Sequence, residues 1–178
     1  MRKLILVLAV AAAATLAGGA SANTNLGGAT SNADGTVTLN SSATPFSAGV
    51  DVSLPGVTFV GDISAFSVDY NFPNGCPTGV PILAIVTVRG TIWTSIGSAG
   101  GFTCAPGTHN AYVLTNTTPT DTHEIVGGTV SDNWGRAHSE YDNLRVLAVQ
   151  LLTTGANQVV TVGNINLVIG SGAPTASM

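Results

Sequence analysis

The stretch from Leu144 to Ile169, LRVLAVQLLTTGANQVVTVGNINLVI, carries the two longest strand patterns of the chain and decides the fold class. Successive side chains of a β-strand point to opposite faces, so apolar residues two positions apart share a face. Leu147, Val149 and Leu151 are therefore expected on one face of a first strand. Val146, Ala148 and Leu152 are expected on its other face.

The second strand pattern follows a turn at Thr153–Asn157 and runs from Val159 to Ile169. Its apolar residues fall on opposite faces unless a β-bulge near Gly163-Asn164 resets the alternation. The stretch therefore predicts that two long strands form and that the chain returns antiparallel between them.

Shorter strand patterns precede this stretch. In Ser64–Phe72 aromatic and aliphatic residues alternate with polar ones, which predicts an amphipathic strand. Val80–Val88 is almost continuously apolar, as is typical of a central strand covered on both faces. About nine or ten short strands with turns between them, and almost no helical periodicity, predict an all-β fold. We expect an antiparallel β-sandwich, either jelly-roll-like or Ig-like.

Residues 1–22 have the pattern of a secretory signal peptide. Arg2 and Lys3 precede an apolar segment from Leu4 to Ala17, and Ala20-Ser21-Ala22 is a small-residue cleavage site. The apolar segment is shorter than the ~20 residues that a membrane span needs. We therefore expect a secreted protein without a membrane span, either extracellular or at the cell surface, with the periplasm as an alternative.

The mature chain divides into three parts. Residues 23–46 form a loose polar arm with one strand, residues 47–170 the β-sandwich domain, and residues 171–178 a flexible tail. The strand in the arm lies in Gly35–Asn40, where Val37 and Leu39 share a face. It is either an edge strand of the domain or a donor strand, which would pair with another copy of the protein through residues 23–45.

Charge and cysteine content restrict the partners. The mature chain keeps three arginines, Arg89, Arg136 and Arg145, against nine acidic residues. Without a basic face, binding to nucleic acid is not expected. Cys76 and Cys104 are the only cysteines, and in an exported protein such a pair predicts one disulfide bond.

Most groups capable of site chemistry lie in the polar stretch from Asp121 to Arg145. If Arg136–Asp142 is extended, three potential metal ligands share one face. With the nearby aspartate and histidine they suggest a divalent metal, bound by Asp121, His123, His138, Glu140 and Asp142. The spacing matches no established metal motif. The alternative is a solvated loop without a cofactor.

The same stretch also suggests a glycan-binding surface. Aromatic faces stack on sugar rings, and amide and charged groups hydrogen-bond to hydroxyls. The candidate residues are Asp132, Asn133, Trp134, Arg136, Glu140 and Tyr141. The alternative is that Trp134 closes one end of the sandwich, because large aromatic side chains are usually buried.

An enzyme is not expected. A carboxylate pair for glycoside hydrolysis could come from this stretch, but a short chain leaves little room for a deep cleft. The chain has no G-x-S-x-G nucleophile motif. We therefore predict an exported, non-enzymatic β-sandwich with a structural or self-associating role, such as a surface, matrix or filament subunit. The alternative is a glycan- or metal-binding module based on residues 121–142, and the third candidate is a small secreted hydrolase.

Overall fold

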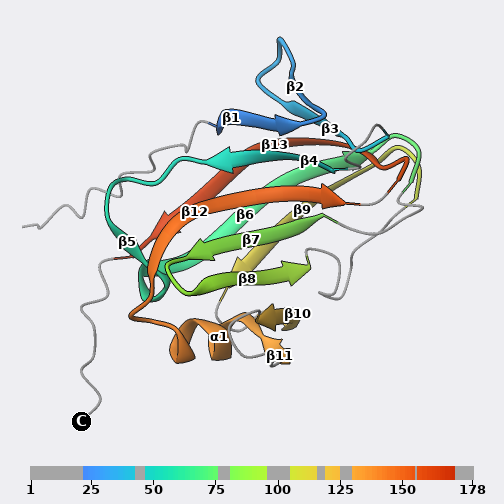
Figure 1. Cartoon of the computed structure of the whole chain (residues 1–178). Helices are drawn as coiled ribbons and strands as arrows, with labels where there is room; N and C mark the ends of the chain where they lie inside the picture. Colours follow the sequence, from blue (N-terminus) through green and yellow to red (C-terminus); the bar gives the residue numbers. More distant parts are fainter. Residues whose placement is uncertain are drawn as a thin grey trace, which may run out of the picture.

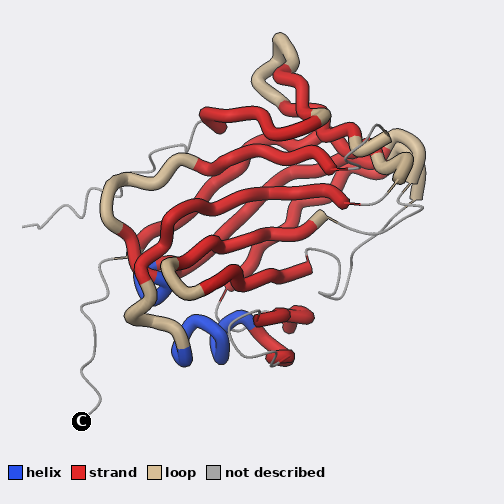
Figure 2. The backbone as a smooth tube through the Cα atoms, in the orientation of Figure 1, coloured by secondary structure: helices blue, strands red, loops and turns tan. Residues whose placement is uncertain are grey.

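Two antiparallel β-sheets pack around one hydrophobic core in the computed structural model (Figure 1). The structure describes residues 22–42, 47–75, 81–95, 105–115, 119–124, 130–154 and 156–170. Strands dominate this part of the chain, as Figure 2 shows, and its helical segments are the α-helix α1 (Trp134–Glu140) and the 3-10 helix η1 (Val60–Asp62). The predicted all-β sandwich is confirmed.

Each sheet combines strands from distant parts of the sequence. Sheet A contains, in spatial order, β1 (Ala22–Gly27), β4 (Ser47–Val52), β12 (Arg145–Thr154), β7 (Ile82–Thr87), β8 (Gly90–Ser95), β10 (Pro119–Glu124) and β11 (Val130–Asn133), with β5 (Thr58–Phe59) paired to β12. Sheet B contains β2 (Ala29–Ser31), β3 (Val37–Asn40), β13 (Val159–Ile169), β6 (Ile63–Phe72) and β9 (Thr108–Thr115).

The two long C-terminal strands form as predicted but do not pair with each other. β12 lies between β4 and β7 in sheet A, and β13 lies between β3 and β6 in sheet B. The bulge in β13 is confirmed, because its register with β6 shifts between Gly163 and Asn166. Val160 and Val162 are buried before the shift and Leu167 after it, so all three contribute to the core.

The predicted shared face of Leu147, Val149 and Leu151 is wrong for Leu147. The register between β12 and β7 shifts between Val146 and Ala148, so a second irregularity resets the alternation there. Val146 and Val149 point into the core, and Leu147 is 54% exposed on the outer face of sheet A. Sequence periodicity alone did not reveal this shift.

Two further strand predictions are confirmed, although the described residues form thirteen strands rather than the nine or ten expected. In β6 the alternating side chains of Phe66, Val68, Tyr70 and Phe72 are buried in the core. β7 lies inside sheet A between β12 and β8, and its consecutive residues Leu83–Ile85 are fully buried. Side chains on both faces of β7 are therefore buried, as the continuous apolar pattern of this segment predicts.

The N-terminal arm holds three strands where the sequence predicted one. β1 pairs with β4, and β2 pairs with β3, which in turn pairs with β13. Val37 and Leu39 of β3 are part of the core. The arm therefore supplies one terminal strand to each sheet, with β1 at the end of sheet A and β2 at the end of sheet B.

Several predictions concern residues outside the described part of the chain. These are residues 1–21 of the signal peptide, the tail 171–178, and both cysteines, Cys76 and Cys104. The structure therefore does not support the expected disulfide bond. No helix among the described residues is long and apolar enough to cross a membrane.

Candidate functional site

The polar stretch 121–145 folds into β10, β11 and α1 at one edge of sheet A (Figure 1). Asp121 and His123 lie on β10, and Asp132 and Asn133 lie on β11. The two strands are antiparallel neighbours, with His123 opposite Val130. The described residues of the stretch thus form the terminal strand pair of a sheet, a helix and the turn that follows the helix.

The expectation that Arg136–Asp142 is extended is wrong, because Trp134–Glu140 is helical. Successive helical residues are rotated by about 100°, so His138 and Glu140 point in nearly opposite directions. Trp134 and Ala137 are buried, whereas Glu140 is exposed. The burial of residues three positions apart is a helical pattern, which the extended interpretation of this segment did not include.

His138 has a structural partner. Its Nε2 atom lies 3.0 Å from the carbonyl oxygen of Gly61, next to η1. A carbonyl oxygen can only accept a hydrogen bond, so Nε2 carries the proton and has no lone pair for a metal. The helical rotation, and not this hydrogen bond, is what keeps the proposed ligands His138, Glu140 and Asp142 from sharing one face.

Asp142 is also engaged at this end of the sandwich. Its backbone carbonyl accepts a hydrogen bond from Gly61 N at 2.9 Å, and its carboxylate accepts one from Asn143 Nδ2 at 2.6 Å. Among the described residues, no group of three or more histidine, cysteine, aspartate or glutamate side chains is arranged to hold a metal.

Trp134 cannot serve as a sugar platform, because its side chain is fully buried. Its ring contacts His138 edge to face, with the ring centroids 5.9 Å apart. Tyr141 is half-buried against the core, whereas Arg136 and Glu140 are exposed. The predicted glycan residues of α1 therefore do not share one exposed surface with Trp134, which closes one end of the core instead.

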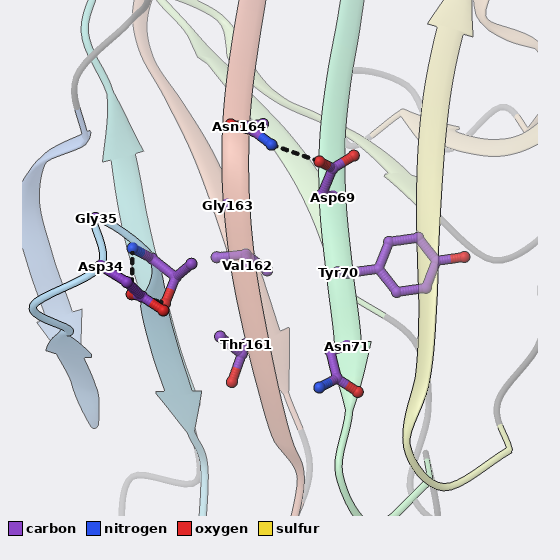
Figure 3. Close-up of a pocket in the computed structure, with 10 residues that line it drawn as sticks. Asp34, Gly35, Asp69, Tyr70, Asn71, Thr161, Val162, Gly163 and Asn164 are labelled. Atoms are coloured by element: carbon purple, nitrogen blue, oxygen red, sulfur yellow. Dashed lines mark hydrogen bonds between the residues drawn. The ribbon is translucent and has the colours of Figure 1, made fainter.

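A polar hollow of about 310 Å³ lies on the outer face of sheet B (Figure 3). The turn between β2 and β3 forms one wall, and the neighbouring strands β13 and β6 form the floor and the other wall. Its lining residues are Asp34, Gly35, Thr36, Asp69, Tyr70, Asn71, Thr161, Val162, Gly163 and Asn164. None of these was predicted as a site residue, because they come from three separate segments.

The carboxylates of the hollow are held by neighbouring polar groups. Asp34 Oδ1 accepts hydrogen bonds from the Thr36 amide at 3.0 Å and the Thr36 hydroxyl at 2.7 Å. These bonds lower the pKa of Asp34 below its ordinary value. Asp69 accepts a hydrogen bond from Asn164 Nδ2 at 2.6 Å, as Figure 3 shows. Asp34 is thus stabilised as a carboxylate and is poorly suited to act as a general acid.

An apolar patch lies on the outer face of sheet A. In one row of the sheet Thr58, Val146 and Thr87 are neighbours and all point into the core. The residues that flank this row therefore point outward. We define the sheet A patch by the four exposed large apolar side chains among them, which are Val57 (68% exposed), Phe59 (41%), Val88 (55%) and Leu147 (54%).

The patch surrounds Arg145. Phe59 pairs with Arg145 across β5 and β12, and Val88 N donates a hydrogen bond to Arg145 O at 3.2 Å. Residues paired across strands have their side chains about 5 Å apart, so these groups form one surface. Five large hydrophobic side chains are exposed among the described residues, and four of them belong to this patch.

The comparison with known proteins assigns no function to either surface. The chain matches no known family model, and no curated protein has a significantly similar sequence.

Proposed function

We propose that this protein is an exported, non-enzymatic β-sandwich with a structural and self-associating role. The sheet A patch is the observation that carries this proposal. Monomeric proteins rarely expose contiguous large apolar surfaces, and those that do so commonly use them for association. Burial of Val57, Phe59, Val88 and Leu147 against another surface would supply the hydrophobic free energy of assembly.

A second copy of the chain is the partner that fits the patch. Arg145 and Arg89 are exposed at the patch, and Asp62 and Asp142 lie at the same end of sheet A. A surface that carries both charge signs around an apolar centre can be complementary to itself. In a two-fold symmetric dimer each surface meets the same surface of its partner, so an arginine of one copy can face an aspartate of the other.

We also infer a jelly-roll arrangement for the sandwich. The strand orders β3-β13-β6-β9 in sheet B and β4-β12-β7-β8 in sheet A support it. Each is a run of four neighbouring strands within its sheet, and the last two strands of the chain lie inside these runs. Jelly rolls occur in capsid proteins and lectins, where assembly or ligand binding rather than catalysis is common. This agrees with a non-enzymatic role.

The disulfide bond between Cys76 and Cys104 remains part of the proposal. Phe72 and Thr108 are paired at one end of β6 and β9, and each cysteine is four residues from one of them along the chain. Mass spectrometry of the alkylated, non-reduced mature protein tests the bond, and two alkylated cysteines would disprove it.

The test of self-association uses two matched substitutions in the mature protein. Leu147→Glu places a charge in the patch, and Val168→Glu places the same charge at an exposed valine of sheet B. Analytical ultracentrifugation should show oligomers for the wild type and for Val168→Glu, and a shift to monomer for Leu147→Glu. A monomeric wild type at all concentrations, or equal effects of both substitutions, would contradict the proposal.

Strand addition through residues 23–45 is the second mode of assembly that we consider. The position of β1 and β2 at the ends of the two sheets favours it, and β1 contains no charge or proline to discourage edge pairing. Asn25→Lys introduces an edge charge on β1. If Asn25→Lys yields monomers and Leu147→Glu does not, the edge strand and not the patch is the interface.

A further inference from the structure

The polar hollow on sheet B is separate from the patch on sheet A and suggests a second activity. Its volume of about 310 Å³ lies at the lower end of the range of small-molecule sites. Thr161 and Gly163 of β13 and Asp69 and Asn71 of β6 form its floor. Their strand neighbours Tyr70 and Val162 are buried, and Figure 3 shows the Tyr70 ring directed away from the Asp34 side of the hollow.

The lining groups select the charge of the ligand. They include two carboxylates, two side-chain amides and two threonine hydroxyls, but no basic side chain. Anionic ligands would meet the carboxylates of Asp34 and Asp69 without a compensating cation. The remaining classes are a metal cation and a neutral ligand that is rich in hydroxyl groups.

The placement of the two carboxylates favours the neutral ligand. Asp69 lies on β6, and Asp34 lies in the turn that leads into β3, with β13 between these strands. Each carboxylate is held by its own neighbour, Asp69 by Asn164 and Asp34 by Thr36. Among the described residues, no group of three or more His, Cys, Asp or Glu side chains is arranged to hold a metal ion. A sugar spanning the hollow could donate hydroxyl hydrogen bonds to both.

The bulge in β13 and the turn between β2 and β3 shape the hollow. Asn164 adopts a left-handed backbone conformation (φ 46°) within the bulge. Its side-chain amide donates a hydrogen bond to the carboxylate of Asp69. A Cβ atom at Gly163 would approach Thr36 Cγ2 to 3.1 Å, so a larger residue at this position would crowd the wall of the hollow. Rigid polar groups reduce the entropic cost of binding.

We propose that this hollow binds a neutral mono- or disaccharide unit of a glycan. The carboxylates of Asp34 and Asp69 accept hydrogen bonds from sugar hydroxyls. The amides of Asn71 and Asn164 and the hydroxyl of Thr161 complete the polar contacts. Because no aromatic ring faces the ligand among the described lining residues, binding of a single unit is weak, and affinity comes from repeated units.

The test uses nuclear magnetic resonance of the ¹⁵N-labelled mature protein. Cellobiose, maltose and N,N′-diacetylchitobiose are titrated separately, and calcium chloride is titrated as a competing probe. At least one disaccharide should shift amide signals of residues 34–36, 69–71 and 161–164. If none of the three disaccharides shifts these signals, or if calcium alone does so, the proposal is overturned.

Two variants link the response to the hollow. Thr161→Phe fills it, and Asp69→Ala removes one carboxylate; each should weaken binding roughly tenfold or more. Thr91→Phe, a matched threonine on the outer face of sheet A, should bind like the wild type. Well-dispersed spectra establish that the variants fold. Unchanged binding in Thr161→Phe would overturn the proposal, and Leu147→Glu should bind normally because the patch is a different surface.

Discussion

The Nε2 atom of His138 lies 3.0 Å from the carbonyl oxygen of Gly61, a residue 77 positions earlier in the chain. This contact joins α1 to η1, two elements that are far apart in the sequence. It also explains why a histidine that suggested a metal ligand has a structural role. The adjacent Trp134 ring packs against the same imidazole.

We expect His138→Ala to lower the free energy of unfolding by about 1 kcal/mol or more. A hydrogen bond contributes roughly 0.5–1.5 kcal/mol, and the substitution also removes the contact with Trp134. Urea denaturation measures the loss. Ser139→Ala, at an exposed position one residue later, is the control and should change stability little. Equal effects of the two substitutions would contradict a structural role for His138.

Asn157 and Asn164 have positive φ angles of 62° and 46°, a region that most side chains avoid. Asn157→Ala should cost about 1 kcal/mol because the left-handed conformation is strained, whereas Asn157→Gly should be almost neutral. Asn164→Gly should cost more than Asn157→Gly, since it also removes the hydrogen bond to Asp69. Thermal melting compares the variants, and equal losses for the two glycine variants would refute the role of that bond.

Gly28 lies where the N-terminal arm passes from sheet A to sheet B. Its amide donates to Ser47 O, and its carbonyl accepts from Asn40 N. A Cβ atom there would collide with the backbone oxygen of Asn40, so Gly28→Ala should destabilise the fold by about 1–3 kcal/mol. The exposed residue Thr30 provides the control Thr30→Ala. A wild-type melting temperature for Gly28→Ala would show that the arm is not packed as described.

Stability should decrease at alkaline pH because of Tyr70. Burial raises its pKa above the ordinary value of 10.0. Above about pH 10 the unfolded chain loses the phenol proton while the folded chain keeps it, so the unfolded state is increasingly favoured. Tyr70→Phe should weaken this pH dependence relative to the wild type. Denaturation curves measured between about pH 8 and 11 test the prediction. If the stability of the wild type and of Tyr70→Phe depends on pH to the same extent, the prediction is rejected.

The strand pattern of β6 and the continuous apolar sequence of β7 were sufficient to predict these elements. Both predictions depend on which residues alternate, and alternation is a local property of the chain. The helix α1 was missed because its seven residues include glycine and polar side chains, and its helical pattern is shorter than two full turns. Its stability comes from Trp134 and Ala137 packing into the core.

The polar hollow could not have been predicted from sequence. Asp34, Asp69 and Asn164 come from three segments that meet only after β13 pairs with both β3 and β6. The same is true of the sheet A patch, since Leu147 becomes exposed only through the register shift in β12. The register shift depends on how β12 pairs with strands from distant parts of the chain, and the local pattern of apolar residues carries no information on that pairing.

The sequence alone determined the all-β class and the position of most strands, because the alternation of apolar and polar residues is local and follows from backbone geometry. It also marked Gly163-Asn164 as the place where a bulge would reset the alternation in β13, and the register with β6 shifts there. Only the tertiary structure decided that β12 and β13 belong to different sheets, that the arm is part of both, and that Trp134 is buried. These features depend on contacts between distant segments, which are selected by packing of the whole core rather than by the preference of any one stretch.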